Sequence, residues 1–302
     1  MKLSGSWVTM LTPFQEDGQV DFDAIPTLVD FYAESCDGIF AVCQSSEMFF
    51  LSLDERVRLG EAVLREARGR LPVVVSGHVA NDFNEQLSEI EAMSRLGADA
   101  VVLVVNRLAS PDEDDNIWLR RLEQVLDRFP SEPFGMYECP YPYPRLLSDE
   151  AVRYIAKTGR FSFVKDTCCC RERLNRRLDL LRCSPVQLFN ANTATLLETA
   201  KAGAGYSGVM ANFHPELYRW LVKHAGDEPV RASRLHAYLT ALSWIEAKAY
   251  PACAKRHLHE KGLPIRDYCR NGAHARITTD LADDLHAIRL IEQEMKALTE
   301  LT

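Results

Sequence analysis

The chain alternates short apolar runs with longer segments of helical periodicity. Eight runs rich in apolar and β-branched residues cover positions 6–14, 38–43, 71–77, 99–105, 133–139, 161–167, 186–192 and 205–212. Between them, apolar residues recur every three or four positions, as in helices that pack one face on a sheet. Eight such repeats predict an α/β fold, and they favour a (β/α)₈ barrel over a doubly wound sheet.

Several helix starts are readable from capping residues. Ser52 and Glu55 have the spacing of a capping box before an amphipathic segment. Ser110 and Glu113 have the same spacing, with Pro111 at a first-turn position. The pattern therefore predicts one helix from each of these serines.

The last ninety or so residues read as helix without further strands. Segments 227–250 and 280–300 carry helical periodicity. We therefore expect a barrel over residues 1–225 and a C-terminal helical extension over 226–302. A doubly wound nucleotide-binding sheet is less well supported, because neither G-x-G-x-x-G nor G-x-x-x-x-G-K-[ST] follows a predicted strand.

Composition narrows the functional classes. Hydrophobic residues make up 47% of the 302 residues and charged residues 26%, an ordinary balance for a soluble domain. The net charge of -8 disfavours a nucleic-acid partner. The N-terminal stretch lacks a secretory pattern, and no apolar run reaches 18 residues. These features predict a cytoplasmic protein with no membrane partner, whose nine irregularly spaced cysteines are reduced thiols.

Candidate chemistry gathers at the ends of predicted strands. Lys165 ends the sixth run, Tyr137 ends the fifth, and Ser45, Ser46 and Glu47 follow the second. The carboxyl ends of barrel strands form one mouth, where barrel enzymes keep their active sites. We therefore expect these side chains to converge.

Each of these residues has two possible interpretations, one structural and one functional. Lys165 either reaches solvent or pairs with Asp166, or it is a desolvated amine that attacks a ketone and forms a Schiff base. Tyr137 is either a packed core tyrosine or the proton shuttle for that chemistry. Ser45 and Ser46 are either turn residues or carboxylate binders.

The order of motifs resembles one family. TPF, SSEMFFLSLDER, YECP, VKDT and GAGYSGVMAN occur as in the dihydrodipicolinate synthase/N-acetylneuraminate lyase family. The resemblance covers the whole barrel and implies an oligomeric barrel, a homotetramer or homodimer, that binds a small 2-oxo acid without a cofactor. It implies that Lys165 is the Schiff-base lysine and Tyr137 the acid/base tyrosine. It also implies that Ser45 and Ser46 hold the oxo-acid carboxylate and that Glu47 is structural.

The loop after the second strand departs from the family pattern. The family reads G-[ST]-T-G-E, whereas residues 43–47 read C-Q-S-S-E. Both glycines are lost, so backbone positions that tolerated positive φ are expected to be restricted. Gln44 adds an amide that can bind substrate or brace the loop.

Other losses concern the second substrate. Glu138 replaces the family asparagine, and Pro142 stands where the synthases carry an arginine for a substrate carboxylate. Arg145 is a candidate replacement. The synthases also place a relay tyrosine after the fourth strand, where this chain has residues 106–108, N-R-L. These losses argue against dihydrodipicolinate synthesis.

We therefore expect the distal end of the substrate to contact Gln44, Glu138 and Arg107. Arg107 offers a bidentate site for a carboxylate. The alternative is a surface arginine that pairs with the acidic run 112–115.

Metal and redox sites find little support. The histidines form no H-E-x-x-H motif, and His257 and His259 are predicted to lie on the surface. Cys168, Cys169 and Cys170 are predicted to be small packing residues, because adjacent side chains cannot readily converge on one ion. No metal site is predicted.

The leading prediction is a metal-independent lyase or aldolase acting on a pyruvate-type 2-oxo acid through a lysine Schiff base. A dehydratase of a sugar-derived 2-oxo acid needs the same imine and stays open. A non-catalytic sensor that binds a 2-oxo acid is the third possibility. The intact Lys165 and Tyr137 weigh against it, and the altered loop keeps it open.

Overall fold

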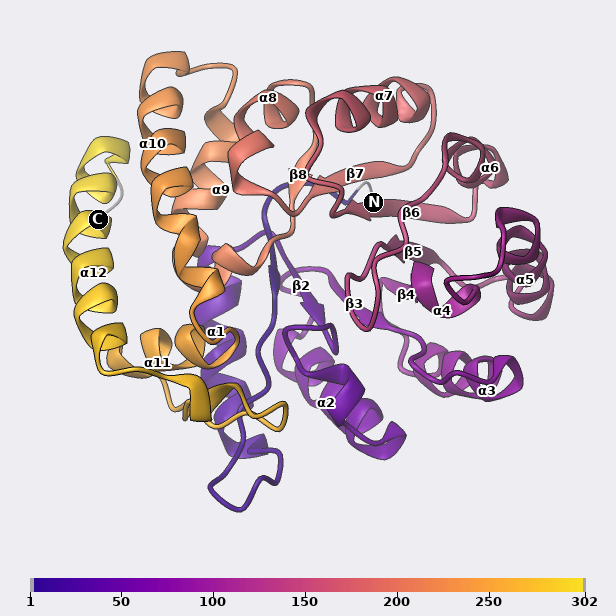
Figure 1. Ribbon diagram of the computed structural model, residues 1–302, viewed down its shortest axis with the longest axis horizontal. Coiled ribbons are helices and arrows are strands. Elements are labelled where there is room, and N and C mark those ends of the chain that lie inside the picture. The colour runs from indigo at the N-terminus through magenta and orange to yellow at the C-terminus, as the bar shows by residue number, and fades with distance from the viewer. Residues whose placement is uncertain (1–2, 301–302) are drawn as a thin grey trace.

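The computed structural model, which describes residues 3–300, is a closed barrel of eight parallel strands (Figure 1). The strands are β1 (Trp7–Thr9), β2 (Gly38–Ala41), β3 (Val73–Ser76), β4 (Ala100–Val104), β5 (Phe134–Tyr137), β6 (Phe161–Asp166), β7 (Gln187–Asn190) and β8 (Gly205–Tyr206). Each strand pairs with the next, and a parallel bridge from Ser6 to Tyr206 closes the ring. The predicted (β/α)₈ barrel is confirmed, and each apolar run holds one strand.

Helices cover the outside of the barrel (Figure 1). They are α1 (Ile25–Ser35), α2 (Leu53–Ala67), α3 (Phe83–Ser94), the short α4 (Val105–Leu108), α5 (Asp115–Arg128), α6 (Asp149–Thr158), α7 (Arg171–Leu181), α8 (Leu196–Lys201) and α9 (Pro215–His224). Short 3₁₀ turns are η1 (Phe22–Ala24), η2 (Met48–Phe50), η3 (Thr193–Thr195) and η4 (Val209–Asn212).

The remaining chain forms α10 (Pro229–Leu242), η5 (Ser243–Ala247), α11 (Ala252–Glu260), η6 (Ala273–Arg276) and α12 (Asp280–Thr299). Helices α10 and α12 lie side by side against α9, on one flank of the barrel (Figure 1). The expected start of the extension, near residue 226, falls between α9 and α10. Within residues 3–300, no helix has the length and apolarity needed to span a bilayer.

Aromatic rings pack together in the interior of the barrel. Trp7, Phe163 and Phe189 pack with ring centroids 5.5–6.3 Å apart. Gly38 and Gly135 face this cluster, and a Cβ on either would lie 2.4 or 2.3 Å from the ring of Trp7 or Phe163. The strand glycines therefore make room for the large rings. Because these rings fill the interior of the barrel, its open end is formed by the carboxyl ends of the strands.

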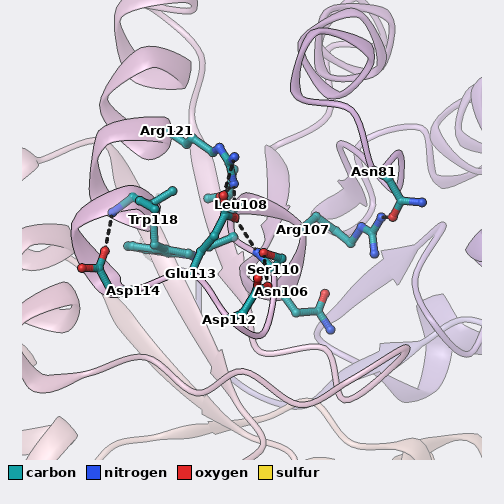
Figure 2. A network of polar contacts seen from close by, with 12 residues as sticks. Asn81, Asn106, Arg107, Leu108, Ser110, Asp112, Glu113, Asp114, Trp118 and Arg121 are labelled. Carbon is teal, nitrogen blue, oxygen red and sulfur yellow. Dashed lines mark hydrogen bonds and ion pairs between the residues drawn. The ribbon is translucent and has the colours of Figure 1, made fainter.

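One of the two predicted caps is confirmed. Ser52 and Glu55 form a complete capping box at the start of α2. Helix α5 instead begins after Asp114 (Figure 2), whose carboxylate accepts the backbone N–H of Ile117. The prediction at Ser110 was wrong because the Glu113 carboxylate accepts the Ser110 N–H and closes a separate turn before the helix.

Candidate active site

Lys165 and Tyr137 lie directly opposite each other on neighbouring strands. The β5–β6 register pairs Tyr137 with Lys165. Both side chains are buried, and the Lys165 ammonium nitrogen lies 4.4 Å from the centroid of the Tyr137 ring and 5.2 Å from that of Phe40. The barrel therefore brings the predicted nucleophile and the predicted proton shuttle together.

The Lys165 amine is buried without an anionic partner. Its side chain is 3% exposed, and it forms no ion pair with the residues that the structure describes. Burial lowers its pKa from 10.5 to about 8, because an apolar environment disfavours the charged form. The surroundings thus raise the fraction of neutral, nucleophilic amine near neutral pH above that of a surface lysine.

The acidic residues that follow Tyr137 and Lys165 point to the other side of the strands. Asp166 and Glu138 both bind the buried guanidinium of Arg177 on α7, with Glu138 at 2.5 and 2.9 Å. This arrangement rules out pairing of Lys165 with Asp166. It also places Glu138 outside the site, contrary to its predicted contact with substrate, because successive strand residues face opposite sides.

Two of the three residues that we predicted to bind substrate from the loop after β2 lie at the cavity. Ser45 and Gln44 line the cavity above Lys165. The Gln44 side-chain oxygen accepts the Tyr137 hydroxyl at 3.2 Å. Ser46 instead turns its hydroxyl inward, donating to the Met10 carbonyl at 2.6 Å, so it braces the loop.

The loss of both family glycines does not restrict the loop in the way expected. The left-handed positions are Val42 (φ 49°) and Glu47 (φ 60°), and neither Cys43 nor Ser46 adopts positive φ. A β-branched residue at positive φ is costly and persists only where surrounding contacts hold it. The loop is therefore held by its packing and hydrogen bonds.

A buried ion pair ties this loop to the C-terminal extension. The Lys255 ammonium of α11 donates to the Glu47 carboxylate at 2.8 Å, and both side chains are fully enclosed. The backbone N–H of Asn271 donates to the other Glu47 oxygen at 3.0 Å. These contacts agree with the structural role predicted for Glu47.

A cavity of about 800 Å³ opens above Lys165 and Tyr137. Its remaining wall comprises Gln44, Ser45, Glu47, Phe49, Phe50, Pro140, Tyr141, Thr167, Ala191, Gly208, Val209, Glu246, Ala247, Tyr250, Pro251, Asn271 and Arg276. A larger hollow of about 1010 Å³ lies beside Gly5 and Pro72, at the amino ends of the strands. The smaller cavity is the candidate active site, because it holds the amine and the phenol.

Comparison with known proteins places this geometry in a family. The family model described as the dihydrodipicolinate synthetase family matches residues 2–288. The chain belongs to this family.

A 4-hydroxy-tetrahydrodipicolinate synthase of Alkalilimnicola ehrlichii is 31% identical over 266 residues, 86% of this chain and 89% of that protein. One from Laribacter hongkongensis is 30% identical, over 77% and 79% of the two chains. The structure of the Methylacidiphilum fumariolicum synthase superposes with a TM-score of 0.86 at 20% identity, covering 99% of both chains. Members of the dihydrodipicolinate synthetase family are aldolase-type lyases that use a lysine Schiff base, and this chain is an enzyme of that class.

The arginine expected at the distal end of the dihydrodipicolinate synthetase family pocket is not supplied by Arg107. Its guanidinium donates to Asn81 (Figure 2) and to the Ala80 carbonyl. It does not line the cavity. The alternative, a pair with the acidic run, is also wrong, because Glu113 pairs with Arg121. Arg145 is bound to Asp115 and to loop carbonyls outside the cavity.

Four polar cavity residues of the C-terminal extension escaped prediction. Glu246, Tyr250, Asn271 and Arg276 line the cavity from the segments η5 to η6, well beyond the last strand. Helical periodicity indicates that such a segment packs on something, but not on what. The available signal was Pro251, which interrupts the helical periodicity and itself lines the cavity.

Two minor predictions need correction. His257 is buried, with its Nε2 3.1 Å from the Phe213 carbonyl, because α11 turns this face toward η4 and the barrel. Cys169 is exposed and Cys168 and Cys170 are only partly buried, because the segment is a loop before α7. Within residues 3–300, no group of three His, Cys, Asp or Glu side chains is placed to hold a metal ion.

Proposed function

We propose that this enzyme binds pyruvate or a close 2-oxo acid as an imine of Lys165 and makes or breaks a carbon–carbon bond next to it. The observation that carries the proposal is the buried Lys165 amine, with a pKa of about 8 and no anionic partner among residues 3–300, paired in register with Tyr137. The sequence relatives support the same chemistry.

The reaction would begin with attack of the Lys165 amine on the carbonyl carbon, C2, of the acid. The Tyr137 hydroxyl would carry the proton that the departing water needs. The protonated imine then draws electrons from C3, so that C3 can lose a proton, attack an aldehyde, or accept the electrons of a breaking C3–C4 bond. Because the imine itself is the electron sink, the scheme needs no metal ion.

The oxo-acid carboxylate would bind at the loop after β2. The Ser45 hydroxyl lines the cavity, and the backbone N–H groups of Ser45 and Ser46 have no backbone acceptor among residues 3–300. Free loop N–H groups next to a hydroxyl are suited to an anion. In this proposal, Ser46 contributes its backbone and Ser45 both groups.

The distal end of the second substrate would face the wall made by the extension. Arg276 is the one arginine among the cavity residues, and the described residues provide it with no ion pair. Of the two acids of the same wall, Glu47 is neutralised by Lys255, and burial raises the pKa of Glu246. We therefore propose a substrate with a distal acidic group, which Arg276 binds in place of the arginine lost at Pro142.

Mass spectrometry after borohydride reduction tests the imine. Pyruvate with borohydride should add an irreversible mass at Lys165, and Lys165→Ala should abolish both labelling and turnover. Lys248→Ala, which changes a lysine outside the cavity, is the matched control. Labelling of another lysine with a fully active Lys165→Ala variant would remove the mechanism. Pyruvate release from a longer acid indicates a lyase, a retained carbon skeleton a dehydratase, and binding without turnover a sensor.

A further inference from the structure

Tyr250 places a phenol in the cavity that also holds Lys165, Tyr137 and Tyr141. It lies between η5 and α11, in the C-terminal extension. Its hydroxyl donates to the Ser45 hydroxyl at 2.7 Å, and Ser45 donates in turn to the Thr9 hydroxyl at 3.0 Å. The extension thus contributes a hydroxyl group to the catalytic loop.

The hydrogen bonds fix the direction of the Tyr250 proton. The Asn212 side chain accepts the Tyr32 hydroxyl through Oδ1 at 2.9 Å, so its amide nitrogen faces Tyr250 at 3.2 Å and donates. The Tyr250 oxygen must therefore accept from Asn212 and donate to Ser45. Burial raises its pKa well above the ordinary value, because a phenolate would lose hydration. Tyr250 is a proton donor at neutral pH.

The phenols of Tyr137 and Tyr250 are directed to different partners. Tyr137 donates to Gln44 and touches the Lys165 ammonium with its ring, whereas Tyr250 donates to Ser45. The synthases place a relay tyrosine after the fourth strand, but this chain has Asn106 there. Asn106 is buried, and its side chain donates to the carbonyl of Cys139, so it cannot take over the role of a phenol. The hydroxyls of Tyr137 and Tyr250 therefore have separate hydrogen-bond partners.

We propose that Tyr250 is a catalytic residue that exchanges a proton with the C4 oxygen when the C3–C4 bond forms or breaks, while Tyr137 serves the imine. This proposal rests on the proposed function. In condensation, the enamine C3 attacks the aldehyde carbon, the carbonyl electron pair moves to oxygen, and that oxygen takes the Tyr250 proton. The proton released from C3 when the enamine formed balances the one that Tyr250 regains from solvent in the cavity. Cleavage runs through the same steps in reverse.

Two measurements separate these roles. Exchange of the pyruvate methyl hydrogens with D₂O, followed by NMR, needs only the imine and the enamine. Cleavage of 4-hydroxy-2-oxo acids, followed as pyruvate release, also needs the C4 proton transfer. The probes are 4-hydroxy-2-oxoglutarate, 4-hydroxy-2-oxopentanoate and a six-carbon 3-deoxy-2-oxo sugar acid.

Tyr250→Phe should leave exchange within about threefold of the parent and lower cleavage by about 10²–10⁴-fold, as for a lost acid/base group. Tyr137→Phe should lower both rates. Tyr218→Phe removes a buried hydroxyl that binds Thr193 outside the cavity, and it should change neither. The KM for pyruvate in exchange should not move in Tyr250→Phe, which separates proton transfer from a bracing role for Ser45.

Unchanged cleavage by Tyr250→Phe, or an equal loss of exchange and cleavage, overturns the proposal. A parent enzyme that exchanges pyruvate but cleaves none of the three acids also overturns it, together with the carbon–carbon step. A parent enzyme without exchange instead rejects the imine, so the two failures are distinguishable.

Discussion

Single residues owe their chemistry here to what surrounds them. Lys165 lies against the rings of Tyr137 and Phe40, and the neighbouring Asp166 is turned away to Arg177. An ammonium group in this position loses its hydration and gains only contacts with aromatic rings. These contacts offset only part of the free energy of desolvation. The amine is therefore more readily deprotonated than a surface lysine.

The rate of imine formation should follow the neutral fraction of Lys165. With a pKa of about 8, roughly a tenth of the amine is neutral at pH 7 and about nine tenths at pH 9. Trapping of pyruvate by cyanoborohydride, measured by mass spectrometry, should rise through pH 8 and then level. A rate that keeps climbing past pH 10 would show an unperturbed lysine and remove the desolvation argument.

Arg276 should discriminate between acidic and neutral substrates. Arg276→Gln is expected to leave pyruvate trapping at Lys165 intact and to lower kcat/KM for 4-hydroxy-2-oxoglutarate by roughly 10–100-fold, the range for a hydrogen bond to a charged group. The value for 4-hydroxy-2-oxopentanoate, which ends in a methyl group, should change little.

Arg107→Gln is the matched control for this discrimination. Its guanidinium holds the Ala80 carbonyl and Asn81, so the variant should alter stability without altering the preference between the two acids. Equal losses for both acids in Arg276→Gln would show that Arg276 does not read the charge.

At the scale of elements, the loop after β2 depends on helix α11. Glu47 adopts a left-handed conformation and is held by Lys255 and by the N–H of Asn271. Removing one partner of a buried charge pair costs more free energy than the attraction within the intact pair contributes, because the other charge stays buried and uncompensated. The pair therefore couples the shape of the catalytic loop to the position of the extension.

Lys255→Met should destabilise the protein by about 3–5 kcal/mol, because it leaves the Glu47 carboxylate buried without a cation. The double variant Glu47→Gln, Lys255→Met should recover part of this loss. Urea unfolding measures both. A single variant within about 1 kcal/mol of the parent would show that the pair does not hold the loop.

At the scale of the molecule, barrel and extension share one hydrophobic core. A single cluster of buried residues includes Val29 and Leu217 from the barrel and Leu239, Leu258 and Leu285 from the extension. The extension also carries one wall of the active site. It is thus a part of the barrel enzyme and not an appended domain.

We expect the extension and the barrel to unfold together. Urea transitions followed by far-UV circular dichroism and by tryptophan fluorescence should coincide, since common burial makes unfolding cooperative. Native-state hydrogen exchange should protect amides of α12 and of the barrel helices to similar degrees. Exchange through α12 at low urea, while the barrel stays protected, would contradict this expectation.

The sequence alone determined the barrel and the positions of Lys165 and Tyr137. Strands and helices have hydrophobic periods of two and of three to four residues, and these patterns are local in the sequence. The carboxyl ends of barrel strands all lie at one mouth, so a residue at a strand end can be placed from the sequence. The same reasoning placed Ser45 and Gln44 at the mouth, where they lie.

Only the tertiary structure decided which polar groups complete the site. Arg107 and Glu138 lie just after β4 and β5, at the same end of the barrel as Lys165, yet one is bound to Asn81 and the other to Arg177. Side-chain direction after a strand depends on loop turns and on partners far along the chain. Tyr250 and Arg276 reach the cavity because the extension folds back over the barrel, and that packing is set by buried surfaces that no local pattern encodes.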